Sequence, residues 1–80
     1  MKTVRYTADA LKDLRKLRGE AKAIMAKIAR YAETGAGKVT ELVGQDGAKR
    51  IRIGDFRAIF EETASEITVT KVGNRRDVYE

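Results

Sequence analysis

The 80-residue sequence contains no cysteine, histidine, proline or tryptophan. Without cysteine it can form no disulfide and no thiolate metal cage, and without histidine it lacks the usual zinc ligand. The same absences exclude the histidine-paired nuclease and the cysteine-based or histidine-based hydrolase arrangements. We therefore expect no metal and no cofactor, and the composition suits a reducing, cytoplasmic setting.

Long hydrophobic runs are also missing. No apolar stretch approaches the roughly 20 residues that cross a bilayer, and residues 1–5 contain no apolar signal core. We therefore expect no membrane association. With 42% hydrophobic and 36% charged residues, the chain suits one compact domain over residues 1–80. A domain of this size buries only about 60% of its surface, so we expect a partner protein to add stability.

Basic residues are in excess, and the excess is unevenly placed. Lysine and arginine number 17 against 12 acidic residues, a net charge of +5 that favours anionic partners. Residues 1–40 contain ten basic and four acidic side chains, whereas residues 41–80 contain seven and eight. Solvated helix faces are one explanation of the first-half excess. A nucleic-acid site in the second half would depend on where its cations are placed, because the net charge there is −1.

The first half predicts a short strand followed by two helices. Residues 2–6 alternate and contain β-branched and aromatic side chains, as strands do. Thr7 is placed to cap a helix that continues to Leu17. A second helix is expected over residues 20–34, ended by Gly35. Its predicted buried stripe consists of Ala21, Ile24, Met25, Ile28 and Ala32.

The second half has the period of β-strands. Residues 39–43 form a short extended or turn-like segment and residues 44–47 a polar connector. Strands are expected over 48–53, 56–62 and 66–72, with a type II′ turn at Gly54-Asp55, a turn at Gly73-Asn74 and a tail over residues 75–80. The order β-αα-βββ predicts an α+β fold, with a mainly antiparallel sheet and an antiparallel helix pair packed on one face.

Strand alternation indicates which charged side chains share a face. Around Ile51 the isoleucines point one way and Arg50 and Arg52 the other. In the next strand Arg57 lies opposite the aromatic set, so a hairpin can bring it beside the other two arginines. Such a cluster suits a phosphate, because guanidinium forks match phosphate oxygens. The alternative is that nearby carboxylates and solvent neutralise each arginine singly; the candidates are Asp55, Glu61 and Glu62.

The tail leaves two interpretations open for Tyr79. It can anchor the tail in the core, or it can lie over the sheet and stack on a base, a contact worth roughly 1–3 kcal/mol. Tyr6 and Tyr31 are expected to be packing residues. The segment Gly35-Ala36-Gly37-Lys38 lacks the length and the preceding strand of a phosphate-binding P-loop.

Two segments carry a family resemblance. Residues 49–57 read KRIRIGDFR and residues 72–79 read VGNRRDVY. In this order, within a chain of this organisation, they resemble the RelE/ParE superfamily of bacterial and archaeal toxins from type II toxin-antitoxin systems. The resemblance extends over nearly the whole chain and implies a cognate antitoxin as partner in a hetero-oligomer.

The RelE branch implies a ribosome-dependent endoribonuclease that cuts messenger RNA and so inhibits translation. In this reaction the ribose 2′-OH attacks its own 3′ phosphate, without a metal. The positions that match the family's catalytic residues are Arg50, Arg52, Arg57, Arg75 and Tyr79. Lys49 and Arg76 are expected to bind RNA. Because arginine hardly deprotonates, the general base stays open.

The ParE branch implies a different activity, binding and inhibition of DNA gyrase without RNA cleavage. A third alternative is an inactive member that only binds its antitoxin. Fold alone does not separate these alternatives. The complete arginine and tyrosine set favours the ribonuclease.

Overall fold

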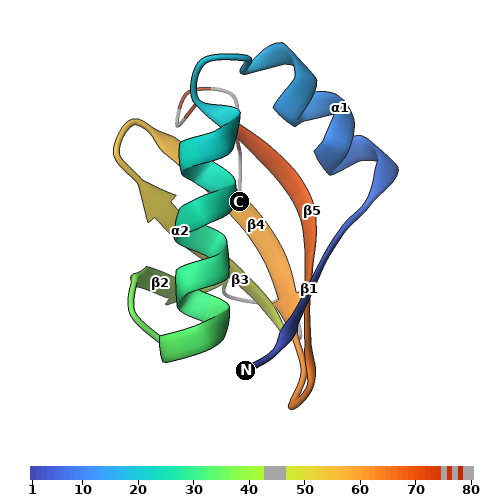
Figure 1. Cartoon of the computed structure of the whole chain (residues 1–80), viewed down its shortest axis with the longest axis vertical. Coiled ribbons are helices and arrows are strands. Elements are labelled where there is room, and N and C mark those ends of the chain that lie inside the picture. The colour runs from blue at the N-terminus through green and yellow to red at the C-terminus, as the bar shows by residue number, and fades with distance from the viewer. Residues whose placement is uncertain (43–46, 75, 77, 79–80) are drawn as a thin grey trace.

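The computed structural model describes residues 1–42, 47–74, 76 and 78. It contains two helices and five strands (Figure 1). In chain order they are β1 (Thr3–Tyr6), α1 (Ala8–Lys16), α2 (Ala21–Thr34), β2 (Lys38–Glu41), β3 (Ala48–Ile53), β4 (Phe56–Glu62) and β5 (Glu66–Asn74). The α+β class and the β-αα-βββ core order are confirmed. The segment expected to be extended or turn-like contributes a further strand, β2.

The five strands form one sheet in the order β1-β5-β4-β3-β2. Strand β1 is parallel to β5, and every other neighbouring pair is antiparallel. Both helices lie on the same face, α1 along β5 and α2 over β1 and β3 (Figure 1). The sheet therefore has a helix face and an open face that neither helix covers.

The core lies between the helices and the helix face of the sheet. Its largest fully buried side chains are Phe60, Ile24, Ile28, Ile67 and Val69. Met25 was expected in this core, but 37% of it is exposed. The buried stripe of α2 is therefore narrower than the sequence pattern indicates. Over the described residues, no helix has the length and apolar character needed to cross a membrane.

Local signals at the helix ends and at one turn act as predicted. The Thr7 hydroxyl accepts a hydrogen bond from the Ala10 N–H at 3.1 Å and caps α1. Gly35 ends α2 with a φ of 78°, a left-handed conformation that glycine adopts without steric cost. Gly54 has a φ of 59° while the φ of Asp55 is not positive, as a type II′ turn between β3 and β4 requires.

The predicted turn at Gly73-Asn74 was wrong. Both residues belong to β5, where Gly73 pairs with Arg57 and Asn74 pairs with Phe56. Cross-strand pairing with β4 therefore outweighs the local turn preference of a Gly-Asn dipeptide. The connector residues 44–46 and the end of the extended segment at Val43 lie outside the described residues.

Strand β5 is longer than its neighbour β1, which pairs only with residues 66–69. Beyond residue 69, side chains from the N-terminal part of the chain form hydrogen bonds with backbone groups of β5. The Asp13 carboxylate accepts a hydrogen bond from the Val72 N–H at 3.0 Å, and the Thr7 hydroxyl donates to the Thr70 carbonyl at 3.4 Å. Helix α1 thus satisfies backbone groups that an edge strand would otherwise expose.

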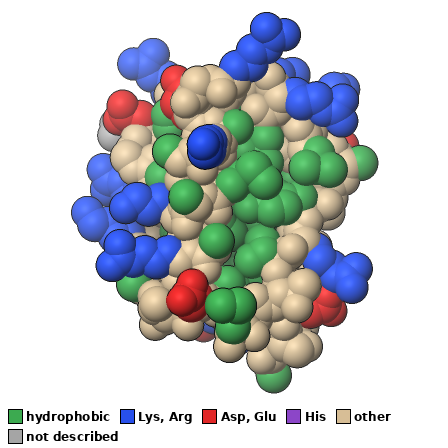
Figure 2. All heavy atoms as spheres, in the orientation of Figure 1, with side chains coloured by type: hydrophobic (Ala, Val, Ile, Leu, Met, Phe, Trp, Pro, Cys, Tyr) green, Lys and Arg blue, Asp and Glu red, His purple; other side chains and the backbone are tan. Residues whose placement is uncertain are grey.

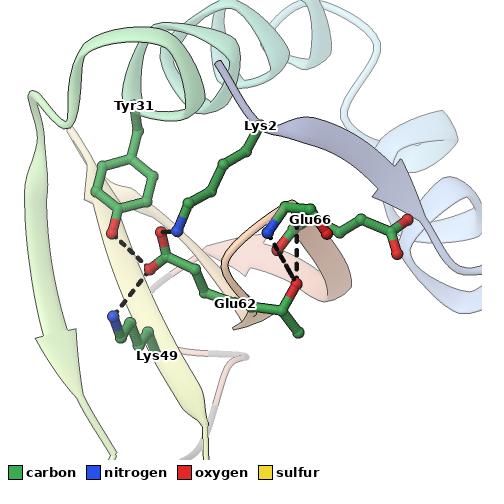
Figure 3. A network of polar contacts seen from close by, with 7 residues as sticks. Lys2, Tyr31, Lys49, Glu62 and Glu66 are labelled. Atoms are coloured by element: carbon green, nitrogen blue, oxygen red, sulfur yellow. Dashed lines mark hydrogen bonds and ion pairs between the residues drawn. The ribbon is translucent and has the colours of Figure 1, made fainter.

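Glu62 is the centre of a polar cluster on the helix face (Figure 3). Its carboxylate accepts hydrogen bonds from the Lys2 ammonium at 2.5 Å, the Lys49 ammonium at 2.8 Å and the Tyr31 hydroxyl at 2.7 Å. The Glu62 side chain is only 11% exposed. The cluster therefore joins the residue before β1, helix α2, strand β3 and the end of β4.

The partners of Glu62 control its ionisation. Desolvation by burial raises its pKa, but the hydrogen bonds from Lys2, Lys49 and Tyr31 and the charge of Lys49 outweigh it and lower the pKa to about 2. The charged carboxylate is therefore the form that stabilises the fold.

We expect Glu62→Gln to lower the free energy of unfolding by about 2 kcal/mol, because it removes the charge that holds two ammonium groups. Glu61→Gln is the matched control, since Glu61 is exposed on the open face and should change stability by less than about 0.5 kcal/mol. Urea unfolding followed by circular dichroism measures both. Equal stability of the two variants would contradict the assignment.

The contribution of Glu62 should also depend on pH. Its pKa falls from the ordinary value of 4.5 to about 2 on folding, so its stabilisation is complete above pH 4.5 and fades as the pH falls towards 2. The difference in unfolding free energy between wild type and Glu62→Gln should shrink over this range. A difference that stays constant down to pH 2 would show that another group is responsible.

Candidate functional site

The open face of the sheet carries three arginines on two adjacent strands. In β3, Ile51 is 2% exposed and belongs to the core, so Arg50 and Arg52 project from the other face. In β4, Ala58 and Phe60 are buried in the core, which places Arg57 on the open face as well. Strands β3 and β4 pair so that Arg52 lies directly opposite Arg57. The sequence alternation therefore predicted the positions of these three side chains on the sheet.

Two rows of residues cross this part of the open face. One row runs over four strands through Lys38, Arg52, Arg57 and Gly73. The next row runs through Thr40, Arg50, Ile59 and Lys71. The described residues of these two rows include lysines and arginines but no carboxylate, so this region of the sheet is positively charged.

The arginines differ in exposure. Arg52 is exposed, whereas Arg50 and Arg57 are half-buried and the Nε atom of Arg57 is buried. Like charges directly opposite each other on a sheet are destabilising. A polyanion bound between the two side chains would offset this repulsion, because guanidinium groups bind phosphate oxygens through paired hydrogen bonds.

The carboxylates expected as alternative partners of the arginines lie in different places. Glu62 is on the helix face, committed to Lys2 and Lys49. Glu61 is on the open face but pairs with Ala48 and Thr68, one row beyond Arg50. Asp55 is exposed in the β3–β4 turn. Neutralisation by Glu62 is therefore excluded by the side of the sheet on which it lies.

The other candidate residues do not share one surface. Lys49 lies on the helix face, and its ammonium contacts Glu62 rather than the arginine surface (Figure 3). Arg76 is exposed, and its N–H donates to the Asn74 side-chain oxygen at 3.1 Å. Arg75 and Tyr79 lie outside the described residues. The structure therefore brings Arg50, Arg52 and Arg57 together and leaves Lys49 on the opposite face.

Two cations of this surface were missed by the sequence analysis. Lys38 pairs with Arg52 because β2 joins the sheet, whereas residues 39–43 alone indicated only a short extended or turn-like segment. Lys71 pairs with Ile59, and its position next to buried Val72 in a predicted strand was a signal for the open face.

This arrangement can bind phosphate and stabilise negative charge that develops on it. It does not identify a proton acceptor, because arginine stays protonated in proteins. Among the described residues, no three carboxylates gather as metal ligands would. The chemistry visible on this surface is electrostatic.

Comparisons with solved structures agree with this fold. The chain resembles a chain of the Escherichia coli DinJ-YafQ toxin-antitoxin complex, with a TM-score of 0.79, 11% identity, and coverage of 99% of this chain and 98% of that one. It also resembles a chain of the archaeal RelE-RelB complex from Pyrococcus horikoshii OT3, with a TM-score of 0.76, 19% identity, and coverage of 96% and 98%. For the YoeB dimer from Staphylococcus aureus the values are 0.71, 16%, 88% and 92%. At these identities the likeness is one of fold.

Sequence comparison gives the family. No curated protein sequence matches the chain. The family described as the ParE toxin of the type II toxin-antitoxin system parDE matches residues 4–79. This match includes both helices, all of β2 to β5, and β1 without its first residue. The chain therefore belongs to the ParE toxin family of type II toxin-antitoxin systems.

Proposed function

We propose that this toxin is a ribosome-dependent endoribonuclease that cuts messenger RNA and thereby inhibits translation in the cytoplasm. The observation that carries the proposal is the cross-strand pair of Arg52 and Arg57 on a sheet face that neither helix covers. Arg57 is half-buried and Arg52 beside it is exposed. A phosphate held by the Arg57 guanidinium would therefore also be within reach of the more exposed Arg52 side chain.

In the proposed reaction the ribose 2′ oxygen attacks the adjacent phosphorus. A bond forms between O2′ and phosphorus while the bond from phosphorus to O5′ breaks. The 2′ hydroxyl loses its proton and O5′ gains one, so the chain is cleaved into a 2′,3′-cyclic phosphate and a 5′-hydroxyl end. Negative charge increases on the phosphate oxygens in the transition state. Preorganised cations stabilise that charge without the reorganisation that water would need. Arg57 is assigned this function, and Arg50 and Arg52 contact the RNA around the attacking group.

Two further residues are included in the proposed site because of the resemblance to the superfamily. Arg75 follows the Val-Gly pair near the end of the chain, and Tyr79 stands near the C-terminus where relatives have an aromatic residue. We assign Arg75 to the phosphate and Tyr79 to stacking on the nucleotide at the cleavage point. Arg76 is proposed as a weaker RNA contact, whereas Lys49, expected to bind RNA, lies on the helix face and pairs with Glu62.

An antitoxin is the proposed neutralising partner. Apolar side chains gather in the middle of the face on which α1 and α2 lie (Figure 2). Leu11 on α1 is 41% exposed and Met25 on α2 is 37% exposed. An apolar segment of an antitoxin could anchor here, and acidic residues on the same partner would suit the net charge of +5. Two of the structural relatives, from the DinJ-YafQ complex and from the RelB-RelE complex of Methanococcus jannaschii, were solved in toxin-antitoxin complexes.

Arg57→Ala should reduce cleavage of ribosome-bound transcripts by at least about 100-fold, the usual cost of removing one group that stabilises an oxyanion. Primer extension on translated messages measures this loss. The variant should keep its fold, with an unfolding free energy within about 1 kcal/mol of wild type. Arg30→Ala is the matched control, because Arg30 is exposed on α2. Undiminished cleavage by the Arg57 variant would overturn the site assignment.

Inhibition of DNA gyrase is the second candidate, favoured by the family match to ParE toxins. The two candidates differ in what stops first after the toxin is induced. The ribonuclease predicts rapid loss of labelled amino-acid incorporation while DNA synthesis continues. The gyrase inhibitor predicts early loss of thymidine incorporation with induction of the SOS response. Pulse labelling of both precursors in the same culture decides between them.

A further inference from the structure

A hollow lies at the edge of the sheet, where α2, the start of β2 and the β3–β4 turn meet. Its volume is about 310 Å³. It is lined by Lys27, Gly37, Lys38, Arg52 and Gly54. We call it the edge pocket.

The lining of the edge pocket is cationic. Three of its residues carry a positive charge and the other two are glycines, so no carboxylate lines it. Within the described part of the chain, none of Lys27, Lys38 and Arg52 has an ion-pair partner. On the helix face, by contrast, Lys2 and Lys49 are both paired with Glu62. Figure 2 shows Lys and Arg side chains gathered along the left margin, beside α2 on the side of the β3–β4 turn.

The two glycines add no side chain to the lining of the pocket. Gly54 takes the positive φ of the hairpin turn and adds no side chain to the rim. Gly37 has a φ of 153°, and a Cβ placed on it would lie 3.1 Å from the Ile51 Cδ1 atom. The backbone at residue 37 therefore lies close against the core side chain of Ile51.

The edge pocket is continuous with the arginine surface. Lys38 pairs with Arg52 across β2 and β3, and Arg52 pairs with Arg57 across β3 and β4. Two strand spacings separate Lys38 from Arg57, about 10 Å. Arg52 belongs to both places, so one chain of cations leads from the half-buried Arg57 around the sheet edge to Lys27 on α2.

We propose that the edge pocket binds a backbone phosphate of single-stranded RNA, next to the phosphate held at Arg57. The identity of the polyanion rests on the proposed ribonuclease function. Grooves that follow a single strand combine a line of cations with little sequence preference. Lysines act in such grooves as point charges on phosphate, and Lys27 and Lys38 have no competing carboxylate in the pocket.

The test measures RNA binding by the full chain without cleavage. The probe is a short single-stranded RNA with 2′-O-methyl groups, which cannot supply the attacking hydroxyl, and fluorescence anisotropy gives its affinity over a salt series. Lys27→Gln should lower the slope of log affinity against log salt by about 0.7, one phosphate contact. At physiological ionic strength this corresponds to about fourfold weaker binding.

Lys22→Gln is the matched control, because it removes the same charge from an exposed position on the same helix outside the pocket. Glutamine keeps a helix propensity close to that of lysine, so neither change should disturb α2. The proposal expects the slope to change for Lys27→Gln and to stay unchanged for Lys22→Gln. Equal changes in both variants would overturn it, since the effect would then come from net charge alone.

Two further outcomes separate this inference from the proposed function. If Lys27→Gln weakens binding of the cognate antitoxin but not of the RNA, the pocket binds a protein carboxylate and the proposal is overturned. If the wild type fails to cleave ribosome-bound transcripts while the Lys27 effect on RNA binding persists, the ribonuclease function fails and the phosphate pocket stands.

Discussion

Strand β3 is paired with β4 so that Ile51 lies opposite Ala58 and Arg52 lies opposite Arg57. Because side chains alternate along a strand, a slip of one residue would bring Arg52 under the helices and leave Ile51 in water. An unpaired guanidinium in that core would cost several kcal/mol. Burial of the isoleucines on one side therefore fixes the arginines on the other, and the cationic surface is a consequence of the same register that builds the core.

The cations on the two faces of the sheet have different neighbours. On the helix face, the carboxylate of Glu62 holds the ammonium groups of Lys2 and Lys49, and the carboxylate itself is only 11% exposed. Those charges are compensated within the fold and stabilise it. On the open face, the rows through Arg52 and Arg50 contain no carboxylate. The paired cations of the helix face thus contribute to stability, whereas the two rows on the open face bring cations of neighbouring strands side by side.

Much of the fold could be predicted from the sequence, because the deciding signals are local. Apolar spacing, the Thr7 cap and Gly35 located the helices, and alternation located β3 and β4. The failures depend on distant partners. Gly73 and Asn74 join β5 because β4 lies beside them, and Glu62 finds Lys2, which is 60 residues away in the chain. No local pattern contains either of those contacts.

The site could be predicted only in part from the sequence. The distribution of charge between the two halves of the chain shows why the rest could not. Residues 41–80 have a net charge of −1, yet they supply the three arginines of the open face. Alternation along two strands was enough to find these. The first half, with its net charge of +6, supplies Lys27 and Lys38 at the pocket beside them. That meeting requires β2 to pair with β3 and α2 to lie over β3, which are contacts between the two halves of the chain. Two lysines of the basic first half and the arginines of the second therefore belong to one surface, and only tertiary structure joins them.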